Sequence, residues 1–377
     1  MKFIVSRDVL FKNLSAVSGV LSTNNTMPIL DNFLFSISGN VLTVTASDLD
    51  ATISASIDLI EVEGEGVVAV PSKTLLDTLK LTADMPIVFN IDIENKVMNF
   101  TADQGEYASP CYAGDEYPAL PAMSEAKSFD IEAEVLQRAI GKTLFATSND
   151  ELRPNMTGVL CELSSENITF VATDGHKLVR YRNFKNHAED FASFILPKKP
   201  LTQLKNILAN ASTSVKVDYS SNTNHIQFSF DNIVLFSSLK EGKYPSYEKV
   251  IPTENNNHFI VERSEFLKCI RRASIYSNQS TYQVRIALSE ENTTVSAEDI
   301  DYSNKAEEHV SGQFTGEAMN IGFNAKFLRE MIEALDSTEI RIEMSQPNSP
   351  ALIFPHNSAN EDEDVLMLIM PVMLSNY

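Results

Sequence analysis

The residues best suited to chemistry are two pairs of aspartates spaced two positions apart. Asp48 and Asp50 form one pair, and Asp299 and Asp301 form the other. Alternate residues of a strand share a face, and converging carboxylates can hold two catalytic metal ions. The corresponding segment in the middle of the chain reads Asp174-Gly, a dipeptide typical of hairpin turns. A turn therefore explains all three segments better than a metal site does.

No other cluster in the sequence predicts a reaction. His176 stands alone, and a lone histidine is more often structural than catalytic. The chain lacks Gly-x-Gly-x-x-Gly, Gly-x-x-x-x-Gly-Lys-Ser/Thr, Gly-x-Ser-x-Gly and His-Glu-x-x-His, so the common phosphate cradles, nucleophile turns and zinc sites are missing. We therefore expect a protein that is not an enzyme, with no catalytic residue, metal or cofactor.

The cysteines indicate the compartment. Cys111, Cys161 and Cys269 lie far apart in the chain, which disfavours a disulfide or metal framework. We expect reduced, mostly buried thiols in a cytoplasmic protein. The first residues lack a long apolar run, so we expect neither a signal peptide nor a membrane span.

The elements that position these residues recur along the chain. Phe3-Ile-Val-Ser-Arg-Asp is echoed by Phe129-Asp-Ile-Glu-Ala-Glu and by Phe259-Ile-Val-Glu-Arg-Ser. The spacing of roughly 126 residues exceeds that of solenoid repeats and suits an independent domain. We predict three domains, at residues 1–122, 128–252 and 258–377.

Hydrophobic periodicity divides each repeat into helices and strands. The helical period predicts six helices, at residues 6–21, 72–81, 131–147, 198–209, 263–277 and 325–335. Alternating apolar and polar residues predict half-buried strands, for example at residues 33–38, 41–46, 51–57, 168–173, 225–230 and 340–344. Strands outnumber helices, so we predict an α+β fold in which each repeat packs two helices on antiparallel sheets.

Charge is distributed unevenly between these elements. The formal net charge of −21 on its own disfavours binding to nucleic acid. The six predicted helices nevertheless hold fifteen lysines and arginines against seven acidic residues. Surface helices often collect lysine, which is one explanation. The other is a basic face that meets a polyanion while the acidic remainder repels it.

The last apolar segment differs from the other strands. Residues 365–374 are rich in methionine and contain Pro371. Proline restricts a segment to a sheet edge or a strand end, and methionine-rich surface suits an adaptable binding groove. The sequence pattern alone leaves two readings open, a binding groove and a final core strand.

Several motifs resemble those of one family over essentially the whole chain. They are Met1-Lys-Phe, Met27-Pro-Ile-Leu-Asp-Asn, Leu152-Arg-Pro-Asn-Met-Thr-Gly, Val171-Ala-Thr-Asp-Gly-His-Lys-Leu, Gly242-Lys-Tyr-Pro-Ser-Tyr, Ile321-Gly-Phe-Asn and Leu368-Ile-Met-Pro-Val. They are similar to bacterial DNA polymerase III beta subunits, the replication sliding clamps. The resemblance implies three tandem copies of a DNA-clamp domain, assembled as a ring by a head-to-tail homodimer, with helices lining the hole.

The resemblance also implies a function and partners. We expect a processivity factor for DNA replication that encircles duplex DNA without reading its sequence. It would tether the DNA polymerase III alpha subunit, the clamp-loader complex and other proteins that carry a clamp-binding motif. Diffuse cations that face phosphates suit a ring that holds DNA and still slides.

Three sets of site residues follow from the resemblance. The implied peptide-binding residues are Met156, Thr173, Gly175, His176, Lys177, Leu178, Pro245, Lys249, Val250, Leu368, Met370, Pro371, Val372 and Met373. The candidate DNA contacts are Lys12, Lys73, Lys80, Arg138, Lys142, Arg153, Lys198, Lys199, Lys205, Arg271 and Arg272. The implied dimer interface contains Tyr107, Ile275 and Tyr276.

The chain departs from the family pattern in two places. Asn24 and Asn25 occupy an early loop where some relatives have an arginine that touches DNA, so no contact is assigned there. Met373 stands where a basic residue is common, and residues 375–377 extend beyond the usual terminal leucine.

Two other classes of protein compete with the sliding clamp. One is a metal-dependent nuclease that uses the two aspartate pairs. The other is a monomeric adaptor that binds peptides and not DNA. The missing catalytic motifs argue against the nuclease, and the number of chains in the native protein separates the clamp from the adaptor.

Overall fold

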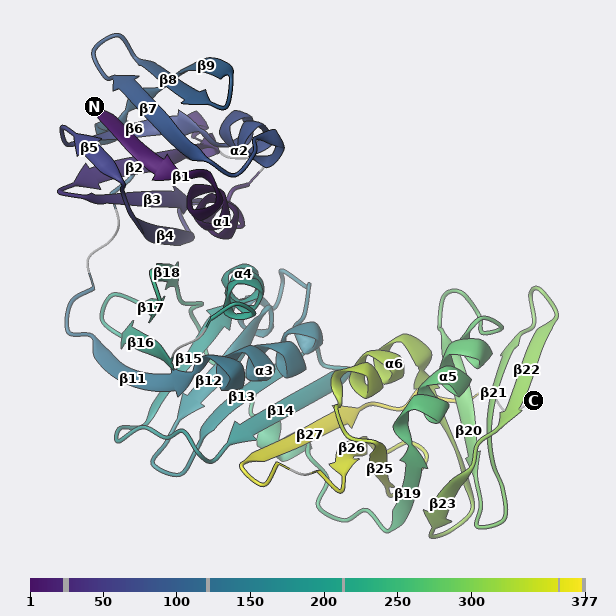
Figure 1. The fold of residues 1–377 in the computed structure, drawn as a ribbon. Coiled ribbons are helices and arrows are strands. Elements are labelled where there is room, and N and C mark those ends of the chain that lie inside the picture. The colour runs from purple at the N-terminus through teal and green to yellow at the C-terminus, as the bar shows by residue number, and fades with distance from the viewer. Residues whose placement is uncertain (23–26, 120–122, 212–213, 359, 375–377) are drawn as a thin grey trace. The chain divides into compact units, whose positions relative to one another are not determined.

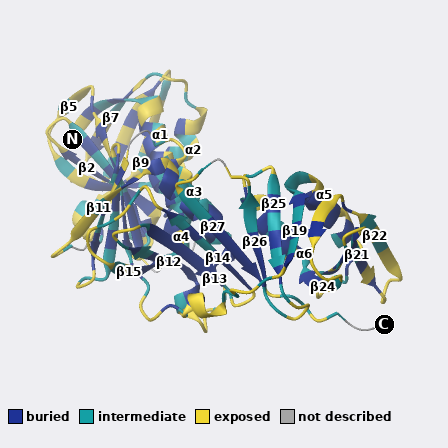
Figure 2. Ribbon diagram, turned by 90° about the horizontal axis from the view of Figure 1, so that it is seen from below, coloured by how far each residue is buried: buried dark blue, intermediate teal, exposed yellow. Residues whose placement is uncertain are grey.

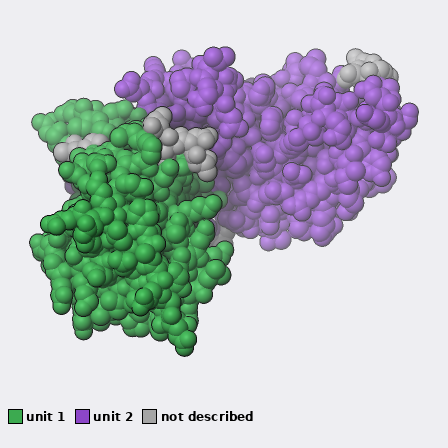
Figure 3. Space-filling view, turned by 90° about the horizontal axis from the view of Figure 1, so that it is seen from above, with its two compact units in different colours: residues 1–137, 199–239 green, residues 138–198, 240–377 purple. Residues whose placement is uncertain are grey.

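The computed structural model describes residues 1–22, 27–119, 123–211, 214–358 and 360–374. It divides into two compact units, drawn in green and purple in Figure 3. Unit 1 contains residues 1–137 and 199–239, and unit 2 contains residues 138–198 and 240–377. The division runs through the second repeat, so each unit holds one outer repeat and a part of the middle one.

The first repeat begins with a strand and a helix and places a second helix before its last strands (Figure 1). Its helices are α1 (Arg7–Ser18) and α2 (Ser72–Leu81). Its strands are β1 (Lys2–Ser6), β2 (Asn32–Ser38), β3 (Val41–Ser47), β4 (Ala51–Asp58), β5 (Glu61–Glu63), β6 (Gly66–Pro71), β7 (Pro86–Asp92), β8 (Val97–Ala102), β9 (Gly105–Pro110) and β10 (Tyr112–Ala113).

The second repeat follows the same order without the short additional strands. Its helices are α3 (Ala133–Thr143) and α4 (Lys198–Leu208). Its strands are β11 (Lys127–Glu132), β12 (Gly158–Leu163), β13 (Ile168–Thr173), β14 (Lys177–Asn183), β15 (Ala192–Pro197), β16 (Ser214–Ser220), β17 (His225–Phe230) and β18 (Ile233–Ser238).

The third repeat restores one short strand, β23 (Gly312–Thr315). Its helices are α5 (Arg263–Ser274) and α6 (Ala325–Ala334). Its other strands are β19 (Asn257–Glu262), β20 (Gln283–Leu288), β21 (Thr293–Asp299), β22 (Asn304–His309), β24 (Met319–Asn324), β25 (Glu339–Met344), β26 (Ala351–His356) and β27 (Glu363–Ile369).

Each repeat contributes two groups of four neighbouring strands. The first repeat supplies the orders β1-β7-β8-β9 and β6-β2-β3-β4. The second supplies β11-β16-β17-β18 and β15-β12-β13-β14, and the third supplies β19-β25-β26-β27 and β24-β20-β21-β22. Strands β9, β18 and β27 each stand at the same end of the corresponding four-strand group, so they are equivalent in the three repeats. Strands β4, β14 and β22 are equivalent for the same reason.

Two antiparallel pairings extend the sheets from one repeat to the next. Strand β18 pairs with β4, with Leu235 opposite Ile53. Strand β14 pairs with β27, with Leu178 opposite Leu368. We call these pairings the first joint and the second joint. The remaining equivalents, β9 and β22, stand at the ends of their described sheets.

Burial explains why the sequence pattern predicts these elements. The inward positions of β17 and β25 are buried at every second residue, and α1 buries Leu10, Leu14 and Val17 on one face. Figure 2 shows mostly buried residues, in dark blue, along β14 and β27. All six predicted helices are confirmed. The largest difference is at α3, which ends at Thr143 and continues as a 3₁₀ turn at Leu144–Ala146.

The three cysteines are free and buried, as expected. Burial raises the pKa of the Cys269 thiol to about 12, so this thiol stays protonated near neutral pH. None of the helices in the described ranges is long and apolar enough to cross a membrane.

Candidate functional site

The three aspartate segments are turns that the first aspartate of each segment stabilises. Asp48 Oδ1 accepts hydrogen bonds from the backbone N–H groups of Asp50 (3.2 Å) and Ala51 (2.9 Å). Asp174 Oδ1 accepts two such bonds in the second repeat, and Asp299 Oδ1 accepts one from Asp301 (3.1 Å) in the third. Side-chain bonds to the backbone two or three residues on are typical of turns.

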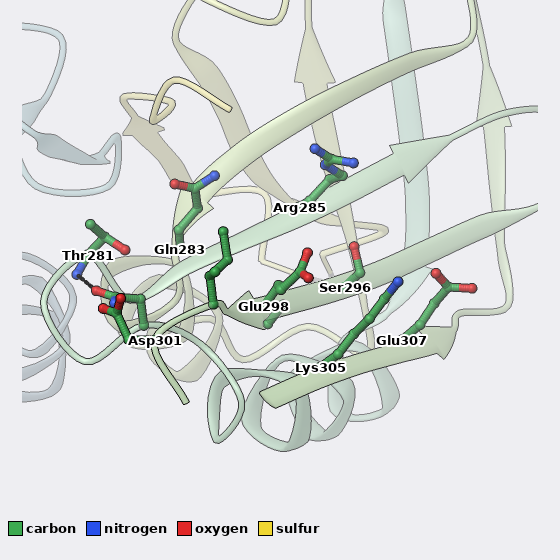
Figure 4. Close-up of a pocket in the computed structure, with 11 residues that line it drawn as sticks. Thr281, Gln283, Arg285, Ser296, Glu298, Asp301, Lys305 and Glu307 are labelled. Carbon is green, nitrogen blue, oxygen red and sulfur yellow. Dashed lines mark hydrogen bonds between the residues drawn. The ribbon is translucent and has the colours of Figure 1, made fainter. Parts of the chain in front are cut away.

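The nuclease alternative finds no support at these turns. Asp299 is buried, whereas Asp301 borders a cavity of about 380 Å³ on the outer face of β20, β21 and β22 (Figure 4). This cavity also holds Arg285 and Lys305, so its charges are mixed. Within the described residues, no group of three His, Cys, Asp or Glu side chains could hold a metal ion.

The second joint brings the predicted peptide-binding segments together. Strand β14 follows the turn at Asp174, and its first residue Lys177 lies opposite Ile369. Beyond β27, the N–H of Met370 donates to the carbonyl of His176 at 2.9 Å. Strand β27 ends before Pro371, which confirms that the proline stands at a strand end.

The chain then crosses to a different sheet. The N–H of Val372 donates to the carbonyl of Gly322 in β24 at 2.9 Å. A Cβ atom at Gly322 would come within 2.7 Å of the backbone carbonyl oxygen of Val372, so glycine lets the tail backbone lie this close. The predicted tail residues are thus held by both sheets of the third repeat. Residues 375–377 lie outside the described residues, as do Asn24 and Asn25.

Several of the predicted peptide-binding residues are buried and not exposed to solvent. All five of the following are at least nine-tenths buried: Met156, Thr173, Lys177, Leu178 and Leu368. Leu178 and Leu368 belong to one apolar cluster together with Tyr244. We therefore interpret them as the buried floor beneath the predicted peptide-binding residues, and we expect the peptide contacts among the accessible members of the set.

The accessible members are mainly apolar. Met370, Met373 and Val250 are exposed, and Pro371 and Val372 are half-buried. His176 and Lys249 are exposed and add polar groups to this set. Gly175 is also exposed, and Pro245 is half-buried. Exposed methionine and valine beside a buried apolar floor can bind apolar side chains of a partner.

The sequence analysis missed Tyr244, which fixes the floor. Its hydroxyl accepts a hydrogen bond from the N–H of Thr173 at 3.1 Å. Burial raises the pKa of this phenol, so it stays neutral. The motif Gly242-Lys-Tyr-Pro-Ser-Tyr contains this tyrosine, but only its proline, Pro245, was predicted to belong to the peptide-binding set.

Arg153 lies beside the peptide segments. Its Nη1 is 3.3 Å from the position that a Cβ of Gly175 would occupy, and its Nε bonds to Asp150 at 2.9 Å. The sequence analysis grouped this arginine with the DNA contacts. Its neighbours favour grouping it with the predicted peptide-binding residues. The adjacent residues of its motif, which include Met156, were the available signal.

The other candidate DNA contacts divide by their partners. Among the described residues, Lys12, Lys73 and Lys80 are exposed and form no ion pair, and Lys205 is half-buried without one. Lys198 bonds to Asn149. The remaining cations each form at least one ion pair, namely Arg138 with Glu363, Lys199 with Asp48, Arg271 with Glu333 and Arg272 with Glu308.

Lys142 differs from all of these because it is only 6% exposed. Its Nζ donates to Asp336 Oδ2 at 2.7 Å and to the carbonyl of Ala334 at 3.1 Å. A buried cation that is held by a carboxylate and a carbonyl inside the protein does not reach a phosphate on the surface. We therefore remove Lys142 from the DNA contacts.

The candidate dimer residues are exposed on β9 and just after α5, the helix whose Arg272 bonds to Glu308 on β22. Tyr107 lies on β9 and stacks on Phe100, at the outer end of a series of rings that continues through Phe89 to Phe3. Ile275 and Tyr276 follow α5 and are also exposed. Exposed apolar residues beside an unpaired strand are typical of an interface between subunits.

Three tandem copies of a two-helix domain, joined through their sheets, define the chain as a DNA-clamp protein. Three family domains match it in order: the N-terminal domain of the DNA polymerase III beta subunit at residues 1–121, the central domain at 130–246 and the C-terminal domain at 248–373. The chain belongs to the DNA polymerase III beta subunit family.

Curated relatives and solved structures agree with this assignment. The chain is 26% identical to the beta sliding clamp of Pseudomonas aeruginosa, over 99% of this chain and 100% of that one. It is 29% identical to the clamp of Haemophilus influenzae, with 99% and 100% covered. The P. aeruginosa DnaN clamp bound to griselimycin superposes with a TM-score of 0.93, at 26% identity and with 99% and 100% covered.

Proposed function

We propose that this protein is a DNA sliding clamp, a processivity factor without enzymatic activity. It encircles duplex DNA as a head-to-tail homodimer and tethers the replicative polymerase, the clamp loader and other partners. The family membership supports this function, and neither the nuclease nor the monomeric adaptor gains support from the relatives. We place the protein in the cytoplasm, because free cysteines stay reduced in that compartment.

The observation that carries the ring is the pattern of joined and unpaired strands. Equivalent strands pair at both joints, β4 with β18 and β14 with β27. The third equivalent pair is β22 and β9, and each stands at a sheet edge. A head-to-tail contact that repeats the joints brings β22 of one chain to β9 of a second chain. Two such contacts close a ring in which β9 and β22 are both paired.

Binding to DNA rests on diffuse charge. Lys12, Lys73 and Lys80 lie on α1 and α2 and have no acidic partner among the described residues. Each phosphate that such cations neutralise releases counterions, so affinity falls steeply with salt. Charge reversal at these lysines should weaken binding to every duplex alike, whereas a strong preference for one sequence would contradict the proposal.

Partner binding rests on the accessible residues of the second joint. We propose that the surface formed by His176, Val250, Met370 and Met373, above the floor of Leu178 and Leu368, accepts a short partner peptide. An apolar anchor residue contributes about 1.5–3 kcal/mol when it is buried, so Met370→Ala should weaken a polymerase-derived peptide roughly tenfold. Full affinity after deletion of residues 368–377 in a folded dimer would move the pocket elsewhere.

A retention assay tests the function as a whole. The protein is loaded onto nicked circular plasmid with a bacterial clamp loader and ATP, and bound protein is separated by gel filtration. We expect retention on the circle, release after a restriction enzyme linearises it and no loss of nucleotides from the DNA. Equal retention before and after linearisation would exclude a topological link between protein and DNA. Degradation products of the DNA would instead support the nuclease alternative.

A further inference from the structure

Lys177 is a charged residue buried at the second joint. It is only 5% exposed, although lysine side chains usually keep their ammonium group in water. Its Nζ lies 2.8 Å from Glu330 Oε2 and 3.4 Å from Asp174 Oδ2. The same Nζ lies 4.4 Å from the centre of the Phe327 ring. Buried charges need partners of this kind, because an unpaired one is costly.

The partners of Lys177 belong to two different repeats. Asp174 is part of the turn before β14, whereas Phe327 and Glu330 lie on α6 of the third repeat. The His176 ring also stacks on Phe327, with 6.1 Å between the ring centres. One lysine therefore connects the turn of the second repeat with a helix of the third.

This connection reaches the backbone that carries the candidate pocket. The carbonyl of His176 accepts the hydrogen bond from Met370, so a shift of the turn would move the start of the tail. Asp174 fixes the inner shape of the turn through its own backbone bonds. The position of the turn relative to α6, in contrast, depends on contacts between side chains. The charged contacts among these are the ion pairs of Lys177 with Asp174 and Glu330.

The first joint shows what the same place looks like without the lysine. There the turn begins at Asp48, and the first strand residue is Ala51, opposite Ser237. Alanine has no charge with which to bind a helix, and the turn is tied to α4 instead by the exposed Lys199, which pairs with Asp48. The buried cation is thus found at the joint that holds the candidate pocket, and its equivalent at the first joint is a methyl group.

The number of hydrogen-bond donors on the ammonium group decides whether Lys177 contacts the peptide or only positions the residues that do. It has three N–H donors and no acceptor. Two carboxylates and a ring face already surround it, so no donor is left for a bound peptide. We propose that Lys177 is a positioning residue: it does not touch the partner peptide, and its ion pair with Glu330 holds the turn and the tail in the shape that binds. This inference rests on the proposed peptide pocket.

The partner Glu330 distinguishes positioning from direct contact. We would measure binding of griselimycin, which a relative's clamp binds, by calorimetry to the intact dimer of each variant. If Lys177 positions the pocket, Lys177→Met and Glu330→Gln should each weaken binding about tenfold, and the double variant should be no weaker than either single one. Lys326→Met, on the same helix and exposed, is the matched control and should bind as wild type.

Hydrogen exchange supplies a second measurement that does not use the ligand. Loss of the ion pair should speed exchange at the Met370 amide in both variants and leave the amides of β26 unchanged. Dimer mass and the urea midpoint show that each variant is folded.

Three results would overturn the inference. One is wild-type affinity in Lys177→Met, and another is weak binding in Lys177→Met with full affinity in Glu330→Gln, which indicates direct contact. The third is unchanged exchange at Met370. Wild-type protein that fails to bind griselimycin would instead reject the pocket itself, and the inference with it.

Discussion

The first joint and the second joint use equivalent strands, yet their side chains close them differently. At the first joint, the amide of Asn232 donates to Asn13 Oδ1 and to the carbonyl of Ser56, both at 2.7 Å. A cavity of about 580 Å³ remains between α1, α4 and the turn after β17. The ion pair of the first joint, Lys199 with Asp48, has an exposed lysine. At the second joint the paired lysines are buried, with Lys142 bound to Asp336 and Lys177 bound to Glu330.

The difference separates what the fold requires from what it permits. Sheet pairing uses backbone groups that every residue except proline supplies in full, so both joints keep it. The helix contacts use side chains, and these differ between the joints: the lysine that pairs with an acid at the first joint, Lys199, is exposed, whereas Lys142 and Lys177 at the second joint are buried. The second joint, which adjoins the predicted peptide-binding residues, is the one whose paired lysines are buried.

The largest effect on this comparison should come from Asp336→Ala. It leaves Lys142 buried without its carboxylate and removes a second acid near Arg138. Breaking a buried pair costs about 3–5 kcal/mol, and we expect about 2–3 here because Asp336 is itself exposed to water. Urea unfolding measures the change, with the exposed Glu290→Ala as control. A loss equal to that of the control would show that the ion pair is dispensable.

At the first joint, Asn232→Ala should have a smaller effect. The change removes two hydrogen bonds of a neutral amide and leaves Asn13 Oδ1 without its donor, which costs about 1–2 kcal/mol. The matched control is Asn206→Ala, which borders the same cavity from α4. A larger loss than that of Asp336→Ala would reverse the ranking of the two joints.

Filling the cavity of the first joint should stabilise the protein slightly. Ala16 borders the cavity from α1, and leucine would add apolar contacts there. We expect a gain of up to about 1 kcal/mol in the free energy of unfolding from Ala16→Leu. Destabilisation by a similar amount would mean that the space is already filled.

The smallest effect concerns β22, the unpaired counterpart of β4 and β14. The hydrogen bond from Arg272 lowers the pKa of Glu308 below its usual 4.5. A lowered folded pKa contributes stability that is present above the unfolded pKa and is lost as pH falls through the folded one. The stability difference between wild type and Glu308→Gln should therefore shrink from pH 6 to pH 3. A constant difference across this range would contradict the linkage.

Local features of the molecule were predictable from the sequence. The helix period gave all six helices, and the aspartate turns followed from the Asp174-Gly dipeptide, because turn chemistry depends on residues a few positions apart. The strand end at Pro371 followed for the same reason, since proline lacks the N–H that pairing needs.

Long-range partners were not predictable in the same way. Lys142 lies on a basic helix and was assigned to DNA, yet its partner Asp336 is 194 residues away. Lys177 was assigned to the peptide and is bound to Glu330, 153 residues away. Charge and periodicity show that a cation is present. Only the fold decides whether it meets solvent, a phosphate or a carboxylate.

The most direct test of the account is the mass of the native protein. Light scattering at low micromolar concentration should give the mass of two chains for wild type, because β9 and β22 each need a partner from a second copy. Tyr107→Asp and Ile275→Asp should each give the mass of one chain with an unchanged circular dichroism spectrum. A monomeric wild type, or either variant remaining dimeric at the same concentration, would contradict the ring.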